Sequence, residues 1–154
     1  MILKNLKCFL IKLISSVFFI GYLPLIPGTF GSLAGILLFY LLQGAGWISY
    51  LLTILCVLIL GLKASGAMED LLGKKDPGCI VIDEVAGMLL ALSFMPPDFK
   101  IVILAFLIFR ILDTLKPFPA GRLQNWRGSI GVMADDLIAG FYTNLVLQVI
   151  LRIL

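Results

Sequence analysis

The 154-residue sequence contains no histidine, and only 14% of its residues are charged. Without imidazole side chains, the chain cannot build the histidine-ligated metal sites that many hydrolases use. It has three cysteines, Cys8, Cys56 and Cys79, an odd number with no Cys-x-x-Cys spacing. Neither a disulfide framework nor a zinc site is therefore indicated.

The scarcity of charge is matched by an excess of apolar residues, which make up 61% of the sequence and give a mean hydropathy of +1.12. A soluble domain is nearer to about 45–50% apolar and about 25% charged. The length allows one domain, residues 1–154, and the composition predicts that this domain is embedded in a membrane. The net charge of +3 is small and dispersed, so a nucleic-acid partner is not indicated.

Long apolar segments divide the chain into predicted helices. Residues 45–62 contain no charged side chain and are long enough to cross a bilayer. Because lipid cannot satisfy the open edge of a sheet, strands are not expected at membrane depth. The sequence thus predicts an all-α polytopic membrane protein with about four to five hydrophobic helices. The remaining apolar segments are 31–43, 79–95, 101–115 and 136–154, and the paired prolines of MPPDFK at 95–100 divide the middle two.

The first 20 residues are apolar but also carry Lys4, Lys7 and Lys12. No small-residue cleavage site follows them, which argues against a signal peptide and leaves a span or an amphipathic helix in the membrane interface. If they do not cross, ten of the twelve basic residues of the chain fall on one side of the membrane. That side is cytoplasmic by the positive-inside rule, so an N-terminal interfacial amphipathic helix is favoured.

The same topology brings eight of the nine acidic residues to the cytoplasmic side, and only Asp98 lies opposite. Asp83 and Glu84 are expected in the first turn of one helix, Asp113 at the end of the next, and Asp135 and Asp136 at the start of the last. Acids at helix starts are ordinary caps, and for any one of them capping is an adequate explanation. Their number and pairing nevertheless favour a common site.

Five carboxylates at one depth repel one another unless a cation lies among them. Oxygen ligands without histidine suit a hard ion such as Mg²⁺, which binds alongside phosphate. Glycines four residues after two of the acids, Gly87 and Gly140, would allow another backbone to approach on the same helix face. A magnesium site is therefore predicted, with Asp83, Glu84, Asp113, Asp135 and Asp136 as ligands.

Basic residues accompany these acids. Arg110 precedes Asp113 by three residues and shares its helix face, while Lys116, Arg122 and Arg127 follow in the next loop. These cations can hold a phosphate, although Arg110 can also simply pair with Asp113 and the loop can contact anionic lipid.

A turn near the N-terminus adds to the same pattern. The sequence PGTFGS at 27–32 opens a helix and offers free backbone N–H groups together with the hydroxyls of Thr29 and Ser32, a combination that suits phosphate but equally suits a plain turn. The acids, the cations and this turn together indicate phosphate chemistry on a lipid.

Several mechanisms of phosphate hydrolysis are excluded by the sequence. A phosphohistidine intermediate requires histidine, and none of the three cysteines has an arginine at the Cys-x5-Arg spacing of thiol phosphatases. Asp113 begins Asp-Thr-Leu-Lys and lacks the second aspartate of an aspartyl nucleophile motif. Attack by a metal-activated water remains, with one of the carboxylates available as a base.

Four motifs together resemble the phosphatidylglycerophosphatase A family. They are PGTFGS at 27–32, IVIDEVAGM at 80–88, FRILDTLKPFP at 109–119 and GSIGVMADDLIAG at 128–140. The resemblance covers about residues 21–150 and includes the order and spacing of the motifs. One departure is KDPG at 75–78, where some members have a histidine beside the aspartate, and this puts a catalytic role for Asp76 in doubt.

The resemblance implies a bacterial inner-membrane enzyme, with its active site on the cytoplasmic face, that removes the terminal phosphate of phosphatidylglycerophosphate. The products would be phosphatidylglycerol and phosphate, the cofactor Mg²⁺, and no obligate protein partner is evident. By motif, the catalytic residues would be Asp83, Glu84, Asp113 and Asp136, with Asp135 as a further metal ligand. Phosphate contacts would come from Thr29, Arg110 and Lys116, and from the less specific Ser32, Arg122 and Arg127.

A small cation or solute carrier is the main alternative, since acids within a membrane also mark ion paths. A carrier needs its polar groups near the bilayer midplane, whereas these charges are expected at one face and include cations suited to an anionic substrate. A purely structural membrane subunit leaves the paired acids unexplained.

Overall fold

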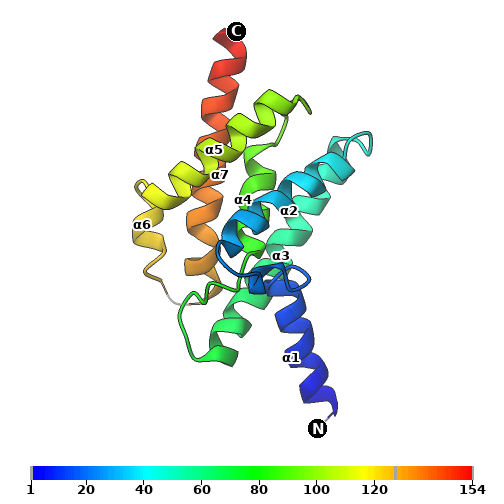
Figure 1. The fold of residues 1–154 in the computed structure, drawn as a ribbon, viewed down its shortest axis with the longest axis vertical. Coiled ribbons are helices and arrows are strands. Elements are labelled where there is room, and N and C mark those ends of the chain that lie inside the picture. Colours follow the sequence, from blue (N-terminus) through cyan, green and yellow to red (C-terminus); the bar gives the residue numbers. More distant parts are fainter. Residues whose placement is uncertain (1, 127, 154) are drawn as a thin grey trace.

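The computed structural model describes residues 2–126 and 128–153, and this part of the chain is helical, with no strand (Figure 1). The predicted all-α class is confirmed, and each of the five apolar segments corresponds to a helix. In chain order the elements are α1 (Ile2–Ser15), η1 (Ile20–Tyr22), α2 (Pro27–Leu41), α3 (Trp47–Leu72), α4 (Ile82–Ala91), α5 (Phe99–Leu115), α6 (Ala120–Leu123) and α7 (Ser129–Ile153).

Helix α4 lies at the centre of the bundle, packed against α2, α3, α5 and α7 (Figure 1). Eight of its ten residues are buried, and the large core cluster is built around its apolar side chains. Because successive helices alternate in direction, the starts of α2, α4 and α7 lie toward the same end of the bundle as the ends of α3 and α5 (Figure 1). Asp83 and Glu84, in the first turn of α4, and Asp113, in the last turn of α5, belong to these helix ends.

Two helices, α3 and α7, are long and apolar enough to cross a membrane. With 26 and 25 residues they extend about 39 and 38 Å at about 1.5 Å per residue. Many of their large apolar side chains are exposed, as expected where lipid is the solvent.

The structure offers fewer candidate spans than the four to five predicted. Helix α4 has 10 residues and α2 and α5 have 15 and 17, so α4 extends only about 15 Å and the other two about 22–26 Å. The hydrocarbon core of a bilayer is about 30 Å thick. The apolar composition identified these segments correctly as helices but did not fix their length.

Helix α4 can end within the bundle because side chains from other helices satisfy its last carbonyls. The Asn144 amide of α7 donates hydrogen bonds to the carbonyl oxygens of Ala91 at 3.0 Å and Ser93 at 2.8 Å. The Tyr50 hydroxyl of α3 donates to the Leu89 carbonyl at 2.6 Å. A helix end without such partners would leave buried polar groups unpaired, which is costly in an apolar interior.

Helix α7 begins two turns earlier than the sequence analysis predicted. It starts at Ser129 rather than Asp136, so Asp135 and Asp136 lie within the helix and are buried. The expectation that they open the last helix is wrong, and they do not cap its free N–H groups. Capping therefore no longer explains these two acids.

Helix α1 corresponds to the predicted amphipathic N-terminal helix and packs along the second half of α3. The Val81 N–H, just before α4, donates a hydrogen bond to the Ser15 carbonyl at the end of α1, with an N···O distance of 3.0 Å. This bond links α1 to the start of the central helix. The placement of α1 in a membrane interface stays a prediction.

Helices α4 and α7 cross where two glycines face each other. A Cβ built on Gly140 would collide with the Gly87 carbonyl oxygen, and one on Gly87 would lie 2.6 Å from the Asp136 carbonyl oxygen. Both obstacles are backbone atoms, which cannot move without separating the helices. The predicted close approach at Gly87 and Gly140 is confirmed.

Replacing Gly140 with alanine should therefore lower the free energy of unfolding by about 1–3 kcal/mol, the usual cost of overpacking. Thermal or denaturant unfolding of the detergent-solubilised protein would measure the change. Gly78→Ala is the matched control, because a Cβ at Gly78 meets nothing within 4 Å. Equal stability of the two variants would contradict the tight crossing.

Candidate active site

A polar cavity of about 260 Å³ opens between the helix ends described above. It lies among α2, α4, α5, α7 and the loop before α4. Its ionisable lining residues are Asp76, Asp83, Glu84, Arg110, Asp113, Lys116, Asp135 and Asp136. The cavity thus brings together all five predicted acidic site residues and two of the predicted phosphate contacts.

Three of the acids form a compact group. Asp83 and Glu84 come from the first turn of α4 and Asp136 from α7, and one carboxylate oxygen from each lies within 4.8 Å of the others. Asp83 and Asp136 are only 6% and 4% exposed. Two unit charges at this distance repel by about 3 kcal/mol at an effective dielectric constant near 20. Such a group favours a bound cation.

The helix crossing is what brings these acids together. Asp83 lies one turn before Gly87 on α4, and Asp136 lies one turn before Gly140 on α7. Residues four apart share a helix face, so close contact of the glycines places the two carboxylates next to each other.

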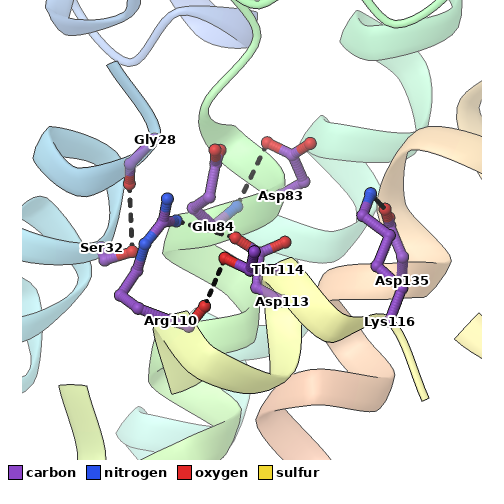
Figure 2. A network of polar contacts seen from close by, with 9 residues as sticks. All are labelled: Gly28, Ser32, Asp83, Glu84, Arg110, Asp113, Thr114, Lys116 and Asp135. Carbon is purple, nitrogen blue, oxygen red and sulfur yellow. Dashed lines mark hydrogen bonds and ion pairs between the residues drawn. The ribbon is translucent and has the colours of Figure 1, made fainter. Parts of the chain in front are cut away.

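Asp113 is paired with Arg110 on α5. The Arg110 Nη1 lies 2.9 Å from Asp113 Oδ2, the intrahelical pair that the three-residue spacing predicted. In Figure 2 the guanidinium of Arg110 lies between the start of α2 and Glu84, so it is close to the acid group as well as to its own partner. Arg110 is therefore positioned beside the candidate cation site.

Asp135 is paired with Lys116, the residue that ends α5. The Lys116 Nζ lies 2.5 Å from Asp135 Oδ2 (Figure 2). Burial by itself lowers the pKa of Lys116, but the hydrogen bond and charge of Asp135 outweigh it, and the pKa is raised overall. Lys116 hence stays cationic at neutral pH. Of the five predicted metal ligands, Asp113 and Asp135 each already have a cationic partner.

Gly28 of the PGTFGS turn leaves room for the side chains of Glu84 and Arg110. A Cβ on Gly28 would collide with the Glu84 carboxylate and lie 3.2 Å from Arg110 Nη1. Ile26, Pro27 and Gly28 line the cavity, so the start of this turn lies beside the acids.

The two hydroxyl residues of the turn, Thr29 and Ser32, lie outside the cavity lining. Ser32 is fully buried and donates a hydrogen bond to the Gly28 carbonyl at 3.0 Å (Figure 2), and neither it nor Thr29 lines the cavity. Phosphate contacts of Thr29 and Ser32 stay a prediction. The Ser32 hydroxyl instead supports the first turn of α2.

Of the predicted loop arginines, Arg122 does not line the cavity. Arg122 lies over the ring of Phe118, with its guanidinium carbon 5.0 Å from the ring centre, a cation–π contact. Arg127 lies outside the described residues. Of the loop cations that the structure describes, Lys116 lines the cavity and Arg122 does not.

Asp76 is a cavity residue that the sequence analysis doubted. It follows α3 in the loop before α4 and has a backbone φ of +43°, which is uncommon for residues other than glycine. Its N–H donates a hydrogen bond to the Glu69 carboxylate at 2.7 Å. In the sequence, only the motif KDPG at 75–78 pointed to Asp76 as a site residue. The left-handed backbone that places Asp76 at the cavity cannot be predicted from the pattern of apolar residues.

Comparison with known proteins identifies the family of this chain. The family described as Phosphatidylglycerophosphatase A matches residues 13–151. Phosphatidylglycerophosphatase A of Escherichia coli is 38% identical over 122 residues, covering 78% of this chain and 71% of that protein. The enzyme of the same name from Haemophilus influenzae is 34% identical, covering 88% and 85% of the two chains.

A third relative has a different name. A Bacteroides thetaiotaomicron protein named "Putative phosphatidylinositol-3-phosphatase" is 35% identical over 150 residues, covering 92% of this chain and 93% of its own. No solved structure matches the chain. The match over residues 13–151 includes all four motifs and every ionisable residue of the cavity, and the chain belongs to the phosphatidylglycerophosphatase A family.

Proposed function

We propose that this protein hydrolyses the terminal phosphomonoester of phosphatidylglycerophosphate, giving phosphatidylglycerol and phosphate. The observation that carries the proposal is the cavity, where a group of three carboxylates lies beside Arg110 and Lys116 in a chain of this family. A carrier is not favoured, because the acids gather at helix ends and are accompanied by paired cations.

The chemistry of the acids fits a divalent cation. Among the described residues, Glu84 Oε2, Asp135 Oδ1 and Asp136 Oδ1 are buried oxygens that accept no hydrogen bond. Buried anionic oxygens without a partner are costly, and hard oxygen ligands match Mg²⁺. Asp83, Glu84 and Asp136 would hold the ion, with Asp113 and Asp135 at its edge.

A bound Mg²⁺ would supply Lewis acidity, both activating water for attack on phosphorus and offsetting the charge of the phosphate. The protein's own cations have a complementary part. Arg110 and Lys116 are each held by one carboxylate in the same cavity, so a phosphate entering it finds two charged donors already oriented. Arg110 and Lys116 would bind the phosphomonoester and orient it toward the acids.

Membrane placement follows from the same elements. Helices α3 and α7 would span the bilayer, and the cavity near the end of α3 and the start of α7 would lie at headgroup height. Ten of the twelve basic residues belong to the segments on that side in the predicted topology. By the positive-inside rule it is the cytoplasmic face of a bacterial inner membrane.

Phosphate release by the purified protein in mixed micelles tests the function directly. Phosphatidylglycerophosphate should be hydrolysed in the presence of Mg²⁺ and not after its removal by a chelator. Phosphatidylinositol 3-phosphate should be assayed in parallel, because one relative bears the name of that activity. Faster release from the inositol lipid would reassign the substrate, and release independent of divalent ions would contradict the metal proposal.

Binding of the ion can be measured without turnover. Mg²⁺ should raise the melting temperature of the wild-type protein, because a ligand that binds only the folded state stabilises it. Asp136→Asn should abolish this rise, since it removes one charge from the group of three. Asp70→Asn is the matched control, because Asp70 is exposed and outside the cavity. A rise that persists in Asp136→Asn would exclude Asp136 as a ligand.

Arg110 offers a test of phosphate recognition. Arg110→Lys keeps the charge but loses the planar fork that matches phosphate oxygens. It should lower kcat/KM by about 10- to 100-fold, since a lost charge-assisted hydrogen bond costs about 1.5–3 kcal/mol. Arg110→Ala should lose more, while Arg122→Lys should stay near wild type because Arg122 lies over Phe118. Full activity of Arg110→Lys would mean that Arg110 only balances Asp113.

A further inference from the structure

Glu69 joins two segments of backbone that are far apart in the sequence. It lies in the last turn of α3 and does not line the cavity. Its Oε1 accepts a hydrogen bond from the Asp76 N–H at 2.7 Å, and its Oε2 accepts one from the Gly128 N–H at 2.9 Å. Both oxygens of one carboxylate are thus used to hold loop backbone.

The location of this carboxylate is otherwise unfavourable. The C-terminal end of a helix carries a partial negative charge, so an acid in the last turn of α3 is disfavoured by the helix dipole. Hydrogen bonds from two N–H groups to an ionised carboxylate are stronger than bonds between neutral groups and offset this cost. The two bonds give Glu69 a specific role that a surface charge would not have.

Asp76 needs an external constraint to keep its conformation. Its φ of +43° lies in the left-handed region, and it precedes Pro77, which favours an extended backbone in the preceding residue. Such a conformation persists when surrounding contacts over-determine it. The bond from Glu69 acts on the N–H of Asp76 itself, and in this conformation Asp76 lines the cavity.

Gly128 links the Glu69 carboxylate to the start of α7. It has a φ of +82° and directly precedes α7, and its carbonyl accepts a hydrogen bond from the Gly131 N–H at 3.0 Å in the first turn of that helix. The Gly128 N–H thereby anchors the Glu69 carboxylate to the start of α7. The anchored carboxylate in turn holds Asp76.

We infer that Glu69 is a positioning residue of the active site, which acts by holding the carboxylate of Asp76 in the cavity. The inference rests on the proposed function. Asp76 lies outside the group of Asp83, Glu84 and Asp136, so loss of Glu69 should impair turnover while leaving the Mg²⁺-dependent rise in melting temperature intact. A general loss of folding would instead remove both the turnover and the Mg²⁺-dependent rise in melting temperature.

The first test compares Glu69→Ala with Asp70→Ala in the full-length, detergent-solubilised protein. Asp70 is the adjacent acid, exposed and outside the cavity. Glu69→Ala should lower kcat about 10- to 100-fold, as expected when a reacting group is misplaced by about 1 Å. It should also speed hydrogen exchange of the amides in segments 73–81 and 128–131. Asp70→Ala should change neither, and Glu69→Gln, which keeps one acceptor oxygen, should fall between.

A double-mutant cycle then tests whether Glu69 acts through Asp76. Asp76→Asn removes the charge but retains a residue type that tolerates a left-handed backbone. The double variant Glu69→Ala/Asp76→Asn should be no less active than Asp76→Asn alone, because the group that Glu69 positions is already lost. Losses that multiply, or wild-type activity in Asp76→Asn, would overturn the inference.

The two proposals fail in different ways. If the wild-type protein releases no phosphate from phosphatidylglycerophosphate, the proposed function fails, and with it the role of Asp76 in turnover. If the wild type is active and Glu69→Ala is equally active with unchanged amide exchange, only the role of Glu69 is wrong.

Discussion

The crossing of α4 and α7 at Gly87 and Gly140 is the constraint on which the rest of the structure depends. The backbones meet there without intervening side chains, and the apolar cluster around α4 holds them together. One turn before each glycine stands a buried carboxylate, Asp83 or Asp136. Packing therefore forces together two like charges that would otherwise separate, and it does so at a fixed distance. A bound cation, as proposed above, would relieve that repulsion.

The short helix α4 is held at both of its ends by contacts with other helices. Helix α4 begins at the acids and ends where Asn144 and Tyr50 donate hydrogen bonds to its carbonyls. At its start, the Val81 N–H also donates a hydrogen bond to the Ser15 carbonyl of α1, so polar contacts with other helices are present at both ends. The ionisable residues of the cavity lie toward one end of the bundle, and most of the length of α3 and α7 can remain apolar, as a membrane requires.

Much of this arrangement could be predicted from the sequence because it depends on local spacing. The pairing of Arg110 with Asp113 follows from helix periodicity, and the convergence of the acids follows from alternating helix direction. The start of α7 was missed because Gly128 and Gly131 suggest a loop, while in the structure Gly131 fits against the Trp126 carbonyl, where a Cβ would collide. The roles of Glu69 and Asn144 could not be predicted, since each binds backbone more than 50 residues away.

The early start of α7 also bears on what kinds of sequence change the protein can accept. Each residue of an α-helix turns the chain by about 100° and advances it by about 1.5 Å. One residue inserted between Gly131 and Asp135 would swing both carboxylates of α7 away from α4, or else displace the anchored turn at Gly128. The helix would remain equally apolar and equally able to cross a membrane. Between Gly131 and Asp135 the number of residues therefore determines the site as much as the acids themselves do. Deletions and insertions in this segment should be far more damaging than conservative substitutions.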